Sequence, residues 1–278
     1  MKPKGAPEAI IGAMDPEAAR AELESRLTPP KRGPLDIDAP LHHFALITYA
    51  VPAERLTRHI PRERFEIPTF EVNGEQRALL SVVPFIDAGF RFRLLPFARF
   101  HFAQTNYRVY VIDRETGQHC VWFFGTTLGG WPVHLARLLW KIPWHPAKYA
   151  WRCRYDDAAA RYVSFIYRVR SEWGDARVEL RDTGEPAGLL PGFGSMEEQT
   201  LILTHPLEGY FYRLDGKLGT YSATHDVLQL TTAEAVDLRF DLLERLGVLT
   251  PQEMQQPHSA LIARETVFHI QMPPRRLS

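Results

Sequence analysis

The sequence is poor in lysine and cysteine, and neither sign of charge is in excess. Lysine and arginine together number 33, as do aspartate and glutamate, so the formal net charge at pH 7 is zero. Such a balance argues against a nucleic-acid partner that the protein would bind mainly by neutralising phosphates with lysine and arginine. The basic residues are nearly all arginine, which favours fixed ion pairs and anion recognition. The lysines are Lys2, Lys4, Lys31, Lys141, Lys148 and Lys217.

Several motifs of known chemistry are also missing. Cys120 and Cys153 match no metal-ligand spacing and give no disulfide framework. The sequence has no HExxH pattern, no glycine-rich phosphate loop and no Gly-x-Ser-x-Gly. We therefore expect neither a metal nor a nucleotide cofactor. No apolar run approaches about 18 residues and the N-terminus has no apolar signal segment, so we expect a cytoplasmic protein without a membrane partner.

Residues 1–40 are expected to form an N-terminal helical arm and linker. Asp15 as N-cap and Pro16 in the first turn predict a helix that runs to about Leu27. A proline-rich stretch over residues 28–34 then ends it. Residues 41–278 are expected to form a single domain that follows this arm.

From residue 42 onward the pattern is that of strands joined by tight turns. The dipeptide Asn73-Gly74, between two strand-like runs, is the strongest hairpin signal. Similar signals predict further hairpins around residues 114–117, 173–175 and 215–217, and a last strand over residues 258–271. Helices are expected over residues 131–142, from Ser195, and over residues 232–246. We therefore expect a mainly β (α+β) fold with a closed or strongly curved antiparallel sheet and a few peripheral helices.

The segment from Ala136 to Lys148 sets two lysines among aromatic and apolar residues. An amine in an apolar pocket tends towards its neutral, nucleophilic form, so Lys141 or Lys148 is a candidate for an imine with a carbonyl compound. The alternative is that Lys141 extends to solvent at a helix end and Lys148 lies in a surface loop. His145 is a candidate general acid or base, or else a packed histidine.

A run of alternating polar residues is the second candidate site. Because side chains alternate along a strand, these residues share one face, which is either solvent or a polar lumen. In a lumen, Arg108 would clamp a carboxylate in bidentate fashion. Glu197, at a helix start, either stabilises the helix dipole or belongs to the pocket. The alternating residues are Gln104, Asn106, Arg108 and Tyr110.

The order of the motifs resembles the uncharacterised YqjF-like family of the acetoacetate decarboxylase-like superfamily, over about residues 42–271. The resemblance implies an antiparallel, cone-like β-barrel with a small-molecule cavity. Acetoacetate decarboxylase uses a Schiff-base lysine, and Trp144 and His145 stand in its place here. YqjF-like members have an acid where this chain has Gln104. The residues that carry the resemblance are Tyr49 to Leu56, Leu80 to Phe85, Thr105 to Val111, Val121 to Phe124, Leu138 to Pro143, Pro191 to Glu197 and Leu214 to Tyr221.

Three functions follow from these patterns. The first is an enzyme that acts on a small oxo-acid or related carbonyl compound, with Arg108 and Asn106 on a carboxylate and His145 or Lys141 handling protons or the carbonyl. The second is a non-catalytic binder of a small organic anion in the same cavity. The third is a structural domain whose barrel is filled by side chains. In each case the expected partner is at most a small molecule, and a homo-oligomer is compatible with all three.

Overall fold

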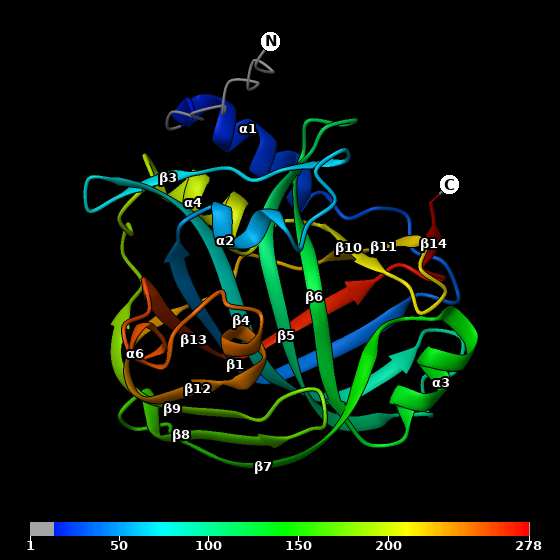
Figure 1. Cartoon of the computed structure of the whole chain (residues 1–278). Helices are drawn as coiled ribbons and strands as arrows, with labels where there is room; N and C mark the ends of the chain where they lie inside the picture. Colours follow the sequence, from blue (N-terminus) through cyan, green and yellow to red (C-terminus); the bar gives the residue numbers. More distant parts are fainter. Residues whose placement is uncertain (1–13, 278) are drawn as a thin grey trace.

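The computed structural model describes residues 14–277, which fold mainly into β-strands (Figure 1). The helices are α1 (Pro16–Leu27), α2 (Glu54–Thr57), α3 (Pro132–Trp140), α4 (Met196–Leu203), α5 (Asp241–Arg245) and α6 (Pro251–Met254). The strands are β1 (Ile37–Val51), β2 (Phe65–Glu66), β3 (Phe70–Val72), β4 (Glu75–Phe92), β5 (Phe100–Asp113), β6 (His119–Gly129), β7 (Trp144–Asp156), β8 (Arg161–Arg170), β9 (Ala176–Pro186), β10 (Glu208–Tyr212), β11 (Leu218–Thr224), β12 (Thr231–Phe240), β13 (Ser259–Ile270) and β14 (Arg275–Arg276).

The long strands β13, β1, β4, β5 and β6 lie side by side, and two groups of strands connect their ends. On one side β10 and β11 run from β6 back to β13. On the other side β7, β8, β9 and β12 make the same connection. Most neighbouring pairs are antiparallel, as expected, but β6 pairs in parallel with both β7 and β10. The expectation of a purely antiparallel sheet is therefore wrong at this strand, because helical or loop connections return the chain to β6 in the same direction.

Two apolar cores lie on opposite faces of the long strands. Successive side chains of a strand point to opposite faces. In β4, Leu80 and Val82 enter the core that β7, β8, β9 and β12 cover, while Leu79, Val83 and Phe85 enter the other. Because β4 is buried on both faces over its middle part, apolar residues follow one another there and do not only alternate. The candidate site lies in the second core.

The N-terminal helix packs on the rest of the protein. Asp15 caps α1 by accepting a hydrogen bond from the backbone N–H of Ala18, as expected. Arg26 of α1 is buried and donates to the carbonyl oxygen of His205 at 2.7 Å. In Figure 1, α1 lies beside α4. The predicted arm and linker over residues 1–40 also contain the start of β1 at Ile37, so the sheet begins within that range.

The helix expected over residues 232–246 is wrong for its first nine residues. Residues 231–240 form β12, and only Asp241–Arg245 are helical, in α5. The Ala-Glu-Ala segment has a good intrinsic helix propensity, but β12 pairs with β9 along most of its length, which satisfies its backbone groups. Leu238 and Phe240 alternate into the core at its end. Tertiary pairing thus overrides local propensity.

Candidate functional site

A cavity of about 130 Å³ lies between the long strands, β10, β11 and helix α3. An apolar cavity of about 150 Å³ accommodates a benzene ring, so this one has room for a single small molecule. Its wall is mainly apolar, with eleven aromatic residues, and it includes part of the segment from Ala136 to Lys148, through Trp140, Ile142 and Trp144. The aromatic lining residues are Phe85, Phe90, Phe92, Phe100, Phe102, Phe123, Trp131, Trp140, Trp144, Tyr221 and Phe268.

Strand β5 brings three of the predicted binding residues into this cavity. Gln104, Asn106 and Arg108 line it, as expected from their alternation along one strand. Gln104 Nε2 donates to Asn106 Oδ1 at 2.8 Å, and Thr126 Oγ1 donates to the same oxygen at 2.8 Å. These bonds fix both amide groups, so their remaining donors and acceptors have defined directions.

Arg108 is held on one side only. Its Nη2 donates to the carbonyl oxygen of Leu203 at 2.8 Å, and its guanidinium lies 5.5 Å from the ring centre of Tyr110. Its Nε is buried and has no hydrogen-bond partner among the described residues. A buried, partnerless N–H of a permanently charged group costs free energy. A ligand oxygen would relieve that cost.

Tyr110 and Glu197, the other two predicted binding residues, do not line the cavity. The hydroxyl of Tyr110 lies 2.7 Å from Ser81 Oγ and donates to the carbonyl oxygen of Leu203 at 3.2 Å. The Tyr110 hydroxyl also accepts a hydrogen bond from Arg108 Nη2 at 3.5 Å. Glu197 is half-buried in the first turn of α4. It is the next residue, Glu198, that is buried, and it accepts from the backbone N–H of Gly194.

Lys141 and His145, the predicted catalytic residues, also lie outside the cavity lining. Lys141 ends α3 in the left-handed conformation, with φ of 55°. His145 is in β7, where its ring stacks on Trp173 with ring centres 4.1 Å apart. Burial, followed by the nearby charge of Arg137, lowers the pKa of His145 to about 4. The structure therefore does not bring these two residues to Arg108, and Lys148 is exposed in β7.

Asp87 is the cavity residue that sequence reasoning missed. It lines the cavity from β4, is 2% exposed, and its Oδ2 has no hydrogen-bond partner among the described residues. Its cross-strand partner is Phe102, two residues before Gln104, which makes Asp87 and Gln104 diagonal neighbours. Burial raises the pKa of Asp87 well above its usual value. The available signal was an acid that shares a strand face with Val83 and Phe85.

Two further side chains with polar rings, His225 and Tyr221, line the cavity. His225 has Nδ1 2.7 Å from the carbonyl oxygen of Asp226 and Nε2 2.7 Å from that of Thr204. Burial lowers the pKa of His225, although the two carbonyl oxygens oppose this shift. Tyr221 stacks on Phe123, with ring centres 5.7 Å apart. Burial raises the pKa of Tyr221, so its hydroxyl is a neutral donor at pH 7.

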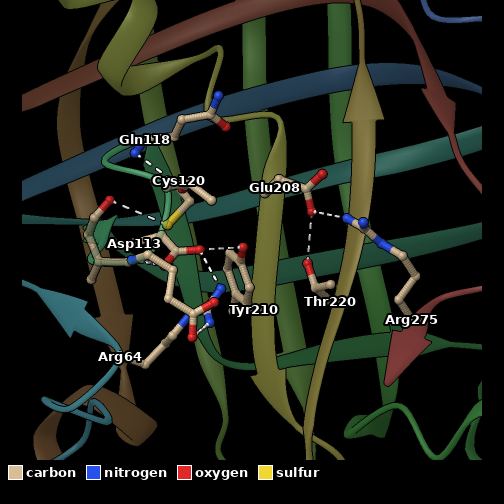
Figure 2. A network of polar contacts seen from close by, with 11 residues as sticks. Arg64, Asp113, Gln118, Cys120, Glu208, Tyr210, Thr220 and Arg275 are labelled. Atoms are coloured by element: carbon tan, nitrogen blue, oxygen red, sulfur yellow. Dashed lines mark hydrogen bonds and ion pairs between the residues drawn. The ribbon is translucent and has the colours of Figure 1, made fainter. Parts of the chain in front are cut away.

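A second buried aspartate shows by contrast how unusual Asp87 is. Asp113, at the end of β5, is 1% exposed, and Figure 2 shows it surrounded by partners. Arg64 donates to its Oδ2 at 2.7 Å and Tyr210 donates to the same oxygen at 2.9 Å. Burial alone would raise the pKa of Asp113, but the hydrogen bond from the Glu115 N–H, the bonds from Arg64 and Tyr210, and the charge of Arg64 lower it. Asp113 thus has partners that stabilise its anionic form, whereas Asp87 has none that offset its burial.

The cavity brings together a cation, two amides and a buried acid. Arg108 supplies a fixed positive charge, the two amides supply directed hydrogen bonds, and burial of Asp87 favours the protonated form of its carboxyl. Neither lysine nor cysteine is present among the lining residues that the structure describes. Residues 14–277 also hold no cluster of three or more histidine, cysteine or acidic residues suited to a metal ion. The chemistry that these groups can perform is recognition of a small acid and polarisation of one of its oxygens.

Three solved structures with acetoacetate decarboxylase-like folds are similar to this chain. An acetoacetate decarboxylase from Legionella pneumophila superimposes with a TM-score of 0.57 at 13% identity, covering 92% of this chain and 95% of that one. An acetoacetate decarboxylase-like enzyme from Sphingomonas wittichii RW1 gives 0.58 at 8% identity, over 89% and 94%. The enduracididine biosynthesis enzyme MppR, complexed with the condensation product of pyruvate and imidazole 4-carboxaldehyde, gives 0.57 at 13% identity, over 89% and 91%. At such identities the likeness concerns the fold.

Comparison with proteins of curated function finds no significant match. Among the described residues, no helix has the length and apolar character to cross a bilayer. The model of one protein family does match, over residues 38–266, which are most of the chain. This range includes the cavity residues Asp87, Gln104, Asn106 and Arg108. The family is described as an uncharacterized conserved protein. The chain, with its acetoacetate decarboxylase-like fold, belongs to this DUF2071 family.

Proposed function

We propose that the protein is an enzyme that binds a small oxo-acid or related carbonyl compound in the cavity, and that it is not a true acetoacetate decarboxylase. The observation that carries the proposal is that Arg108 and an unpartnered buried acid, Asp87, both line the same mainly apolar cavity. MppR, which has a similar fold, has been solved in complexes with pyruvate and with the condensation product of pyruvate and imidazole 4-carboxaldehyde. That precedent supports an oxo-acid as the ligand class here.

In this proposal the ligand carboxylate lies on the Arg108 guanidinium, and Asn106 and Gln104 orient it. Charge-assisted hydrogen bonds of this kind are about twice as strong as neutral ones. Asp87 lies six strand positions from Arg108 in the register of β4 against β5, so its carboxyl proton is the proposed donor to the oxo oxygen of a ligand that extends from Arg108 past Asn106 and Gln104. The donated hydrogen bond stabilises negative charge that develops on that oxygen. A protonated carboxylic acid in an apolar site has this role in known enzymes. Imine formation has no support, because Lys141 and Lys148 lie outside the cavity lining.

A second candidate is a non-catalytic binder of a small organic anion. The placement of His145 favours this candidate, because its ring stacks on Trp173 and is not among the cavity-lining residues. The assignment to the YqjF-like group and the description of the sheet as a cone-like barrel are part of the same proposal. They rest on the motif order and on the closed path of strand pairing.

The test is thermal unfolding with and without a panel of 2-oxo acids, their hydroxy counterparts and simple carboxylates. A ligand at ten times its Kd adds about 1.4 kcal/mol to the free energy of unfolding, which raises the melting temperature by about 3–5 °C. The R108M variant should lose this shift, and the R99M variant, which changes an exposed arginine, should keep it. Turnover of the bound compound, followed by mass spectrometry, separates the enzyme from the binder. If no compound stabilises the wild-type protein, only the structural-domain hypothesis is left.

A further inference from the structure

Helix α3 turns its apolar face to solvent. Its N-cap residue Trp131 is 58% exposed, and within the helix Leu138 is 67% and Leu139 57% exposed. The buried face of the helix consists of Val133 and Ala136. An amphipathic helix in a globular protein ordinarily buries its apolar stripe, so an exposed one indicates a surface that something else covers.

The turn between β4 and β5 adds to this apolar surface. Leu94 is 61% exposed, Leu95 44% and Phe97 80%. Three large apolar residues within four positions, at the tip of a turn, are costly in water, since a solvent-exposed turn is ordinarily polar. The turn therefore has the composition of a contact site.

The turn and the helix form one continuous surface. Phe92, at the end of β4, packs on Trp140 with ring centres 6.4 Å apart. Phe100, at the start of β5, packs on Trp131 at 5.4 Å. The two ends of the turn are thus fixed to the two ends of the helix. Figure 1 shows α3 at the side of the sheet beside the ends of these strands.

The same surface carries basic residues without acidic partners. Arg93, Arg99 and Arg137 each donate to a backbone carbonyl oxygen, and none is ion-paired among the described residues. The sequence has no aspartate or glutamate from residue 88 to 112 or from residue 116 to 155. We call this surface the apolar-basic face: Leu94, Leu95, Phe97, Trp131, Leu138 and Leu139, with Arg93, Arg99, Arg137 and Lys141.

We propose that the apolar-basic face docks the protein on the surface of an anionic lipid bilayer. Leucine, phenylalanine and tryptophan enter the boundary between head groups and acyl chains, while arginine and lysine at the rim meet anionic head groups. Trp131 and Leu135 belong to both this exposed surface and the cavity wall, so docking would place the mouth of the cavity against the lipid. This contact is peripheral, and it differs from our expectation from composition that a membrane partner is absent.

A second copy of the chain is the alternative occupant, and charge argues against it. In a symmetric dimer the same patch lies on both sides of the interface. Each copy would bring Arg93, Arg99, Arg137 and Lys141 against the same four residues, with no carboxylate of the patch between them. Bringing like charges together in an interface is unfavourable. An anionic bilayer complements both the apolar and the basic part of the face.

The experiment is co-sedimentation of the full-length protein with vesicles of phosphatidylcholine alone and of phosphatidylcholine with 30% phosphatidylserine, a composition of about physiological surface potential. We expect binding to the anionic vesicles that weakens at high salt. The F97S/L138S variant should bind about a hundredfold more weakly, from about tenfold for each apolar side chain. The R93Q/R99Q variant should lose the preference for anionic vesicles. Matched controls are V163S/V236S and R177Q/R181Q, which change exposed residues of β8, β9 and β12 and should bind like the wild type.

Three results would overturn the proposal. The first is wild-type binding to anionic vesicles no stronger than to neutral ones. The second is a dimer in analytical ultracentrifugation that F97S/L138S dissociates, which would assign the face to a second copy. A readout on the unmodified protein guards against variants that misfold: brominated lipids should quench tryptophan fluorescence, because Trp131 lies in the face. Absence of quenching, with bound vesicles, would equally refute it.

Discussion

The pH dependence of stability should reveal the unusual state of Asp87. Its carboxyl is 2% exposed and one oxygen has no partner, so ionisation in the folded protein lacks both water and a counter-charge. The folded protein therefore holds this proton more tightly than the unfolded chain, in which the pKa is near 3.8. The stability that this proton contributes is fully present below about pH 4 and is lost as the pH rises towards the raised pKa.

The D87N variant removes this proton and keeps the shape of the side chain. The difference in free energy of unfolding, wild type minus D87N, should fall by about 1.4 kcal/mol for each pH unit within that window. Urea unfolding between pH 4.5 and 7.5, in steps of half a unit, measures the slope. Parallel curves for the two proteins would refute the reasoning, because they would mean that Asp87 has the same pKa folded and unfolded.

Asp113 provides a matched control of opposite sign. It is as buried as Asp87, but its partners lower its pKa, so its contribution to stability is present above about pH 4 and lost as the pH falls through the lowered value. The D113N variant should be destabilised by about 2 kcal/mol at pH 7 through weaker bonds to Arg64 and Tyr210. That loss should shrink below pH 4, in the opposite direction to D87N.

Three further outcomes test the packing and the chemistry. In G209A the new methyl group would lie 2.4 Å from Phe123 Cε2, and we expect about 1–3 kcal/mol of destabilisation in urea unfolding. In S195A the hydroxyl that accepts from the Glu198 N–H is lost, which should lower the free energy of unfolding by about 1 kcal/mol. S195D should keep most of this capping stability, because aspartate also accepts at an N-cap. Borohydride treatment with pyruvate or larger 2-oxo acids should leave no adduct on Lys141 by mass spectrometry, since that amine is outside the cavity; a lysine adduct would restore the imine mechanism.

The parts of the fold that depend on short-range signals could be predicted from the sequence. Asn73 and Gly74 both adopt positive φ, which is what a two-residue hairpin turn requires, and β3 and β4 pair around them. The strands on either side of residues 114–117 were placed correctly for the same reason. β7 is not predicted, because it follows β6 through helix α3 and pairs with it in parallel, so no tight-turn signal marks the pair.

The candidate site was predictable where it follows one strand, and not where it depends on two. Gln104, Asn106 and Arg108 share a face by alternation alone, so a single strand is enough to group them. Asp87 joins them only through the register of β4 against β5, and neither strand contains that information by itself. Lys141 and His145 do not line the cavity, and an apolar neighbourhood in sequence does not show which cavity a side chain faces.

The position of the acid follows from that register. The YqjF-like pattern has an acid where Gln104 stands, and Gln104 here donates its amide N–H to Asn106, which a carboxylate cannot do. Asp87 reaches the same end of the cavity from the neighbouring strand. Two carboxylates at diagonal positions in a dry cavity would repel each other, so an acid at 87 favours a neutral residue at 104. Strand β5 has no acidic residue at this position, but the cavity has one in Asp87 of the neighbouring strand. The presence of this acid supports the proposed carbonyl chemistry.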